Sequence, residues 1–296
     1  MASSLFYPYR SEASRDRCFA YLDSVAARTW PAASESRTVT TSYGTTFVRV
    51  TGPREAPPLV LLAGATGTSL MWAPNISALS AHFRTFAVDQ AGDFGRSLCT
   101  RPLPTLEDLL AWMTELFDAL DLRRGLNLAG MSYGGALTVQ YALRFPERLK
   151  KIVLLAPGST VFRTPLKFMA RVLLIALSRR RFIPPFLRWV FPAMTRKDPQ
   201  WVQTVIDQTL LNFDNMQKRP MPFPPVLTDA EWRALKVPTL FLVGEHEVIY
   251  PAAKALRRLR SAAPSVTAEC IPAAGHDLTF AQTQLVNTRI LEFLRQ

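Results

Sequence analysis

The chain has 296 residues, of which 48% are hydrophobic and 20% are charged, and this balance excludes wholesale disorder. The longest apolar run, around residues 172–177, is far too short to cross a bilayer. The net charge is +12, but no nucleic-acid-binding motif accompanies it, so we expect no nucleic-acid partner. We attribute the basic excess mainly to solubility and arginine codon bias, with weak association with an anionic surface as the alternative.

Strand and helix signals alternate along most of the chain. The first 36 residues are expected to form an N-terminal helical extension. Strand signals follow at residues 37–41, 46–50, 59–62, 84–88, 125–129, 152–155, 239–243 and 266–271. Helical signals lie between them at residues 74–82, from 105 onward, and at 136–143, 252–262 and 280–295. This alternation predicts an α/β fold with a mostly parallel eight-stranded sheet and helices on both faces.

The alternation stops near residue 158 and resumes near residue 237. The segment between them has about eighty residues, which is too long for an ordinary loop, so it should be structured. Its amphipathic stretches, basic cluster at residues 179–181 and many prolines predict an inserted helical cap. We therefore divide the chain into the extension (1–36), a core (37–157 and 237–296) and the cap (158–236).

A serine between glycines marks the most informative turn. The strand signal at 125–129 is followed by Gly130-Met131-Ser132-Tyr133-Gly134 and then by the helical residues 136–143. A serine at such a strand-to-helix turn is typical of a nucleophile elbow, which exposes the hydroxyl at the carboxyl edge of the sheet. Ser132 is therefore the candidate nucleophile.

A serine nucleophile needs a base, and the base needs an orienting acid. The chain has three histidines. His82 precedes a strand and so lies on the side of the sheet away from the elbow. His246 lies between two glutamates, and His276 follows the last strand. His276 is the best candidate base, because its loop can reach the elbow. Glu245 and Glu247 both follow the strand at 239–243, and either could supply the acid.

With Ser132, a post-strand glutamate and His276 in this order, the chain resembles the α/β-hydrolase superfamily, most of all its capped carboxylesterases. The resemblance covers roughly residues 37–296 and implies an inserted cap over the sheet. It implies Glu247 as the acid, three residues after Gly244. It also implies an oxyanion hole made by the backbone N–H groups of Tyr133 and Ala65.

The chain departs from the family at one point and agrees with it at another. The usual His-Gly pair before the oxyanion donor is replaced by Ala63-Gly64, so a histidine side chain that orients this loop is absent. The loop at residues 89–97 looks like the family's structural turn, and we assign it no chemistry. Ser132 disfavours epoxide hydrolases and haloalkane dehalogenases, which use an aspartate at the elbow.

We therefore predict a serine hydrolase that cleaves a modest, mainly apolar carboxylic ester through an acyl-enzyme, with a small-molecule ester as its partner. No cofactor or metal is expected, since no ligand cluster is present. The alternatives are a carbon–carbon bond hydrolase or thioesterase with the same triad, and a ligand receptor on the same fold. Three scattered cysteines argue against a disulfide framework, and no secretory signal is visible, so we expect a cytoplasmic location; the oligomeric state is left open.

Overall fold

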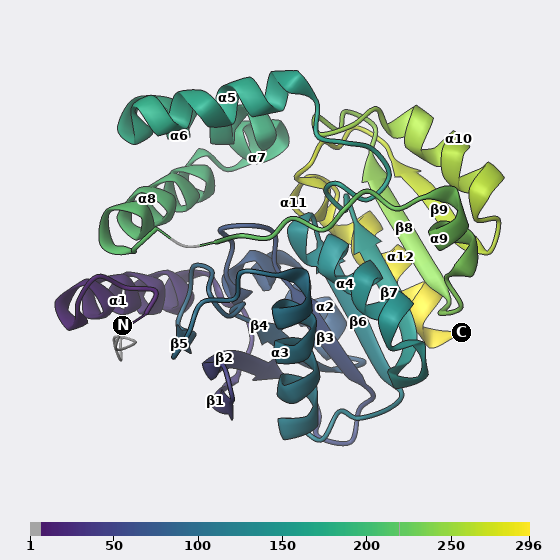
Figure 1. Cartoon of the computed structure of the whole chain (residues 1–296), viewed down its shortest axis with the longest axis horizontal. Helices are drawn as coiled ribbons and strands as arrows, with labels where there is room; N and C mark the ends of the chain where they lie inside the picture. Colours follow the sequence, from purple (N-terminus) through teal and green to yellow (C-terminus); the bar gives the residue numbers. More distant parts are fainter. Residues whose placement is uncertain (1–6, 219) are drawn as a thin grey trace.

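The computed structural model describes residues 7–218 and 220–296, so the first six residues of the expected extension and position 219 lie outside the described part. One sheet forms its centre, with a main path in the order β1-β2-β4-β3-β6-β7-β8-β9 (Figure 1). The strands of this path are β1 (Glu35–Thr41), β2 (Gly44–Thr51), β3 (Pro58–Leu62), β4 (Arg84–Val88), β6 (Leu126–Met131), β7 (Leu149–Leu155), β8 (Thr239–Gly244) and β9 (Val266–Ile271).

The predicted α/β fold with a mostly parallel sheet is confirmed. All neighbours from β4 to β9 are parallel, whereas β2 is antiparallel to β1 and β4. The eight predicted strands are those of the main path. Among the described residues a ninth strand, β5 (Leu98–Cys99), pairs with β2 off this path. Two residues are too few to show an alternating pattern, so the sequence did not indicate it.

Helices cover both faces of the sheet, and β3 shows how. Leu59 and Leu61 belong to the core under α2 and α12, whereas Val60 and Leu62 belong to the core under α3, α4 and α10. Successive strand side chains point to opposite faces, so a continuously apolar strand needs a layer on each side. The helices of these layers are α2 (Ala73–Ser80), α3 (Leu106–Ala119), α4 (Tyr133–Arg144), α10 (Ala252–Ala262), α11 (Leu278–Ala281) and α12 (Thr283–Arg295); short 3₁₀ turns η1 (Ser69–Trp72) and η2 (Pro146–Arg148) precede α2 and β7.

Residues 158–236, which we call the insertion, lie between β7 and β8. They contain α5 (Leu166–Leu177), α6 (Arg179–Val190), α7 (Pro192–Lys197), α8 (Pro199–Asn215) and α9 (Asp229–Ala234). Figure 1 shows α5 to α8 as a separate helical layer to one side of the sheet, whereas α9 packs against α10. Across the described ranges, no helix combines the length and hydropathy needed to cross a membrane.

The N-terminal helix α1 (Glu12–Thr29) packs against α8 of the insertion. The Ser11 side chain caps it by accepting a hydrogen bond from the Ser14 N–H at 3.2 Å. The Tyr21 hydroxyl donates to the carbonyl of Thr204 at 3.0 Å. The N-terminal helix is thus joined to the insertion. The side chain of Val25 lines the large cavity between the insertion and the sheet.

Candidate active site

Ser132 lies at the turn between β6 and α4, with φ of 52° and ψ of −113°. A residue with a side chain rarely adopts this φ, and such strain costs about 1–3 kcal/mol. Glycines make the turn sterically feasible. A Cβ at Gly130 would lie 2.2 Å from the Gly134 carbonyl oxygen, and one at Gly134 would lie 2.5 Å from the Ala63 carbonyl oxygen. The sharp strand-to-helix turn expected from the sequence is therefore present.

The structure brings Glu247 and His276 together. The His276 Nδ1 lies 2.9 Å and 3.1 Å from the two carboxylate oxygens of Glu247. Both side chains are withdrawn from water, with exposed fractions of 4% for His276 and 0% for Glu247. Because an ionised carboxylate only accepts hydrogen bonds, this contact assigns the proton to Nδ1 and leaves Nε2 able to accept one.

Glu247 is held in place by the backbone that follows it. Its Oε1 accepts hydrogen bonds from the N–H groups of Val248 at 2.8 Å and Ile249 at 2.9 Å. These bonds offset part of the cost of burying a carboxylate and fix its orientation. The local turn therefore directs this side chain towards His276.

The competing candidates lie elsewhere. Glu245 has a 54% exposed side chain and accepts a hydrogen bond from the Ala273 N–H at 3.0 Å. His246 is 67% exposed and lies 3.9 Å from Glu245. His82 is exposed in the turn before β4. Among the described residues, therefore, only Glu247 and His276 form a buried contact between a carboxylate and an imidazole.

The loop after β3 places Ala65 beside the elbow. In the described residues, the Ala65 N–H has no hydrogen-bond acceptor. The loop is anchored on both sides, since Gln90 Nε2 donates to the Ala63 carbonyl at 2.9 Å and Asp93 accepts from the Thr66 N–H at 2.9 Å. Gln90 and Asp93 thus hold this loop in place without a histidine side chain at position 63.

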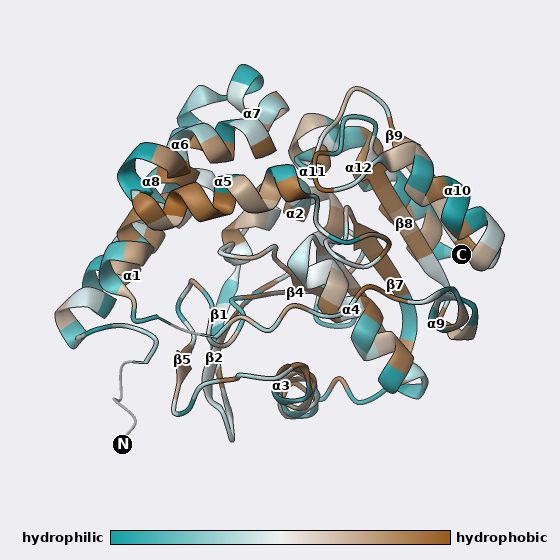
Figure 2. Ribbon diagram, turned by 45° about the horizontal axis from the view of Figure 1, so that its top comes forward, coloured by the Kyte–Doolittle hydropathy of each residue, from teal (hydrophilic) through white to brown (hydrophobic). Residues whose placement is uncertain are grey.

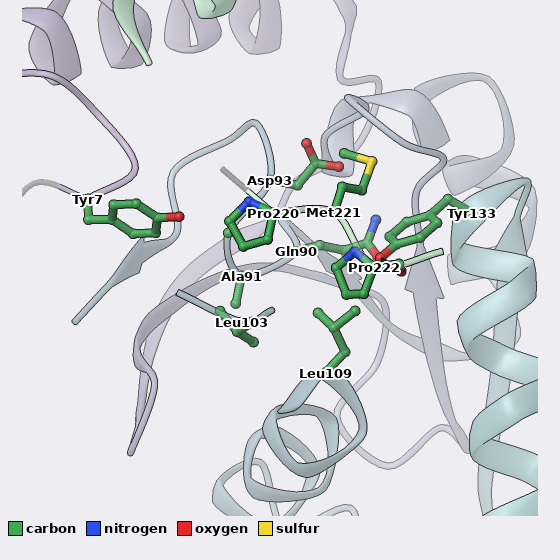
Figure 3. A pocket seen from close by; sticks show the side chains of 11 residues that line it. Tyr7, Gln90, Ala91, Asp93, Leu103, Leu109, Tyr133, Pro220, Met221 and Pro222 are labelled. Carbon is green, nitrogen blue, oxygen red and sulfur yellow. Dashed lines mark hydrogen bonds between the residues drawn. The ribbon is translucent and has the colours of Figure 1, made fainter. Parts of the chain in front are cut away.

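Tyr133, the second expected oxyanion donor, is the first residue of α4. Its hydroxyl donates to the Pro222 carbonyl at 2.8 Å. Figure 3 shows Tyr133, Asp93 and the segment Pro220–Pro222 around a cavity of about 20 Å³, which has room for about one water molecule. The elbow is thereby joined to the returning end of the insertion.

The loop at residues 89–97 has a structural role. Asp89 is buried and accepts hydrogen bonds from the N–H groups of Ser69 at 2.6 Å and Arg96 at 2.8 Å. Burial raises the pKa of this carboxyl, although the two backbone donors oppose that effect. Asp89 does not line the large cavity that contains Ser132.

That cavity lies between the sheet domain and the insertion and has a volume of about 450 Å³. Gly64, Ala65, Ser132 and His276 line it from the sheet side. The insertion contributes a mainly apolar wall that includes Phe168, Ile175, Ile183, Phe186, Val190 and Phe191. An apolar cavity with a few converging polar groups is the usual form of a small-molecule site.

Comparisons with known proteins decide the family. The model of the alpha/beta hydrolase family matches residues 59–288. The chain belongs to this family. It is 37% identical to the uncharacterized carboxylesterase nap of Bacillus subtilis over 89% of the chain and 88% of that protein. It is 35% identical to carboxylesterase YbfK of the same organism over 90% of the chain and 89% of that protein.

A solved structure agrees with these relatives. The crystal structure of naproxen esterase (carboxylesterase NP) from Bacillus subtilis superposes with a TM-score of 0.88 at 35% identity, covering 97% of this chain and all of that one. The predictions of an alpha/beta hydrolase and of a carboxylesterase-type enzyme are confirmed by these similarities.

Sequence reasoning did not single out one side chain that contacts the candidate base. Phe191, between α6 and α7, stacks on His276 with ring centroids 6.4 Å apart and an angle of 20° between the planes. It therefore covers the imidazole from the side of the insertion. No local signal distinguishes Phe191 from the other aromatic residues of the insertion, so only the folded chain could single it out.

Proposed function

We propose that Ser132, His276 and Glu247 form the catalytic triad of an esterase for mainly apolar carboxylic esters. One observation carries the proposal: Ser132 and His276 line the same apolar cavity, and His276 is hydrogen-bonded to the buried carboxylate of Glu247. Nucleophile, base and orienting acid come from three different loops at the carboxyl edge of the sheet, which is the arrangement that serine hydrolysis needs.

In the first half of the reaction, the Ser132 oxygen attacks the ester carbonyl carbon while its proton passes to Nε2 of His276. Glu247 stabilises the resulting imidazolium through Nδ1. The N–H groups of Ala65 and Tyr133 donate to the oxyanion, and one such donor is worth about 3–4 kcal/mol in comparable sites. The carbon–oxygen bond to the alcohol then breaks, and the alcohol leaves with the proton from His276.

In the second half, water attacks the acyl-Ser132 carbonyl and gives its proton to His276. The second tetrahedral intermediate collapses, the carboxylic acid leaves, and Ser132 regains its proton. Each step uses only protein groups, the ester and water. Phe191 and the buried position of His276 shield the ion pair with Glu247 from solvent, which strengthens it.

Labelling with a fluorophosphonate probe, followed by peptide mapping, tests the nucleophile. We expect a covalent adduct on Ser132 and hydrolysis of p-nitrophenyl esters by the same preparation. An adduct with no ester turnover would favour a thioesterase or carbon–carbon bond hydrolase. A serine that reacts with no probe and turns over no ester would favour a ligand receptor.

We also propose a reducing, cytoplasmic setting, based on the three cysteines. All are free; Cys18 and Cys99 are buried and Cys270 is exposed. Burial raises the pKa of Cys18 to about 11 and that of Cys99 to about 12, so both thiols stay protonated and inert at neutral pH. Titration with a chromogenic disulfide should find one thiol in the native enzyme and three after denaturation.

A further inference from the structure

Helix α5 presents apolar side chains to two opposite sides. Phe168 and Ile175 line the cavity. Leu166, Leu173 and Leu177 are 87%, 68% and 75% exposed. With 3.6 residues per turn, the three leucines lie on one face, opposite to the cavity-lining pair. Lys167 and Arg171 lie between these two apolar faces. Apolar faces of a helix are normally buried, so the outer face of α5 lacks a covering layer in the described chain.

This exposure is concentrated on one element. Of the eight large hydrophobic side chains that are exposed in the described residues, six belong to α5; the others are Phe223 and Leu285. Figure 2 shows α5 as a largely hydrophobic helix, in contrast to the mixed colours of α10. A continuous apolar face of this kind on a monomer commonly marks an interaction surface.

Basic residues predominate in the segment around this face. Residues 158–197 contain nine lysines and arginines and no acidic residue. The whole insertion has thirteen basic and five acidic residues, so it carries +8 of the chain's +12. Exposed basic side chains lie at both ends of α5, with Arg163 before it and Arg181 after it, whereas the neighbouring Arg180 is paired with Asp214 of α8 at 2.9 Å. An apolar helical face flanked by arginines is the pattern of helices that lie on anionic membranes.

We propose that the outer face of α5 docks on an anionic lipid surface, with Leu166, Leu173 and Leu177 entering the acyl region. The helix has 12 residues and is about 18 Å long, which is well short of the roughly 30 Å needed to cross the hydrocarbon core. It therefore lies in the plane of the interface. Arg163 and Arg181 then lie at the level of the headgroups, where each basic residue strengthens binding about fivefold.

The charge also decides against a second copy of the chain as the occupant. Two α5 faces packed together would bring two copies of residues 158–197 close to each other. This segment contains basic but no acidic residues, so repulsion between like charges disfavours the pairing. An anionic lipid surface supplies the opposite charge. Because the inner face of α5 lines the cavity, docking also places the cavity next to lipid-dissolved esters, and this consequence alone rests on the proposed function.

Vesicle co-sedimentation tests the docking independently of activity. We expect the full chain to bind phosphatidylglycerol-containing vesicles, to bind phosphatidylcholine vesicles weakly, and to be released by salt. Leu166→Ser/Leu173→Ser/Leu177→Ser should weaken binding by at least about tenfold. Leu285→Ser on α12 is the control and should have no effect. All variants should keep wild-type hydrolysis of p-nitrophenyl acetate, because none of these side chains lines the cavity.

A charge-matched pair of variants separates docking from general electrostatics. Arg163→Gln/Arg181→Gln should weaken binding about 25-fold. Arg257→Gln/Arg260→Gln removes the same charge from the exposed side of α10 and should change binding by less than about twofold. Equal loss in both pairs, or no binding to anionic vesicles, would overturn the proposal. So would a dimer in sedimentation velocity that the leucine variant dissociates while vesicle binding is unchanged.

Discussion

Asp277, the residue after His276, accepts a hydrogen bond at Oδ2 from the backbone N–H of Met194 at 2.8 Å. Asp277 is 1% exposed, and Met194 lies in α7 of the insertion. The loop that carries His276 is thus attached directly to the helical layer above it. A second bond supports the same junction, because Lys197 Nζ donates to the Ala281 carbonyl at 2.5 Å.

We expect Asp277→Ala to lower the free energy of unfolding by about 2 kcal/mol, because it removes a buried acceptor and leaves the Met194 N–H unpaired. The kcat should fall about tenfold as His276 loses its fixed position, a smaller loss than for a triad residue. Asp277→Asn keeps one side-chain oxygen that can accept the Met194 N–H and serves as the control. Denaturant unfolding measures the free energy of unfolding, and steady-state kinetics measures kcat. If kcat is the same in Asp277→Ala and Asp277→Asn, the junction does not position His276.

Ser132→Ala should abolish ester turnover and fluorophosphonate labelling while leaving the fold intact. The change removes one oxygen and keeps the side chain small at a strained φ, so the turn persists. Circular dichroism and unfolding midpoints should match those of the wild type. Ester hydrolysis at the wild-type rate by this variant would refute the assignment of the nucleophile.

Glu247→Gln should reduce kcat by about 10⁴-fold, as loss of the orienting acid does in comparable triads. The glutamine can place its amide nitrogen against Nδ1 and favour the wrong tautomer of His276. Glu245→Gln is the matched control, two residues away and exposed, and should stay within about threefold of the wild type. A severe loss in Glu245→Gln with an active Glu247→Gln would reverse the choice of acid.

The cavity should make kcat/KM rise with acyl length before it falls. Each buried methylene is worth up to about 0.8 kcal/mol, or about fourfold, so hexanoyl esters should exceed acetyl esters. Ile175→Trp fills part of the cavity and should move the optimum to shorter chains. Leu173→Trp, on the outer face of the same helix, should leave the optimum in place. A steady decline from acetyl onward in the wild-type enzyme would contradict an apolar acyl pocket.

Much of the fold follows from local patterns. The apolar runs and the helix signals between them predicted the eight strands of the main path, because side-chain periodicity is a property of neighbouring residues. The turn at Ser132 was predictable for the same reason, since Gly130 and Gly134 are required within five residues. The two-residue strand β5 has no such pattern and depends on its contact with β2.

The site required the tertiary structure. By residue pattern alone Glu245 and Glu247 are equivalent loop carboxylates, and only the family resemblance favoured Glu247. In the structure, the Val248 and Ile249 N–H groups turn the Glu247 side chain inward to His276. The stacking of Phe191 on His276 joins residues 85 positions apart. The sequence showed an apolar run around residues 172–177, but not which side chains of α5 face the cavity and which face water. Such features depend on contacts between distant segments, and these exist only once the sheet and the insertion have packed together.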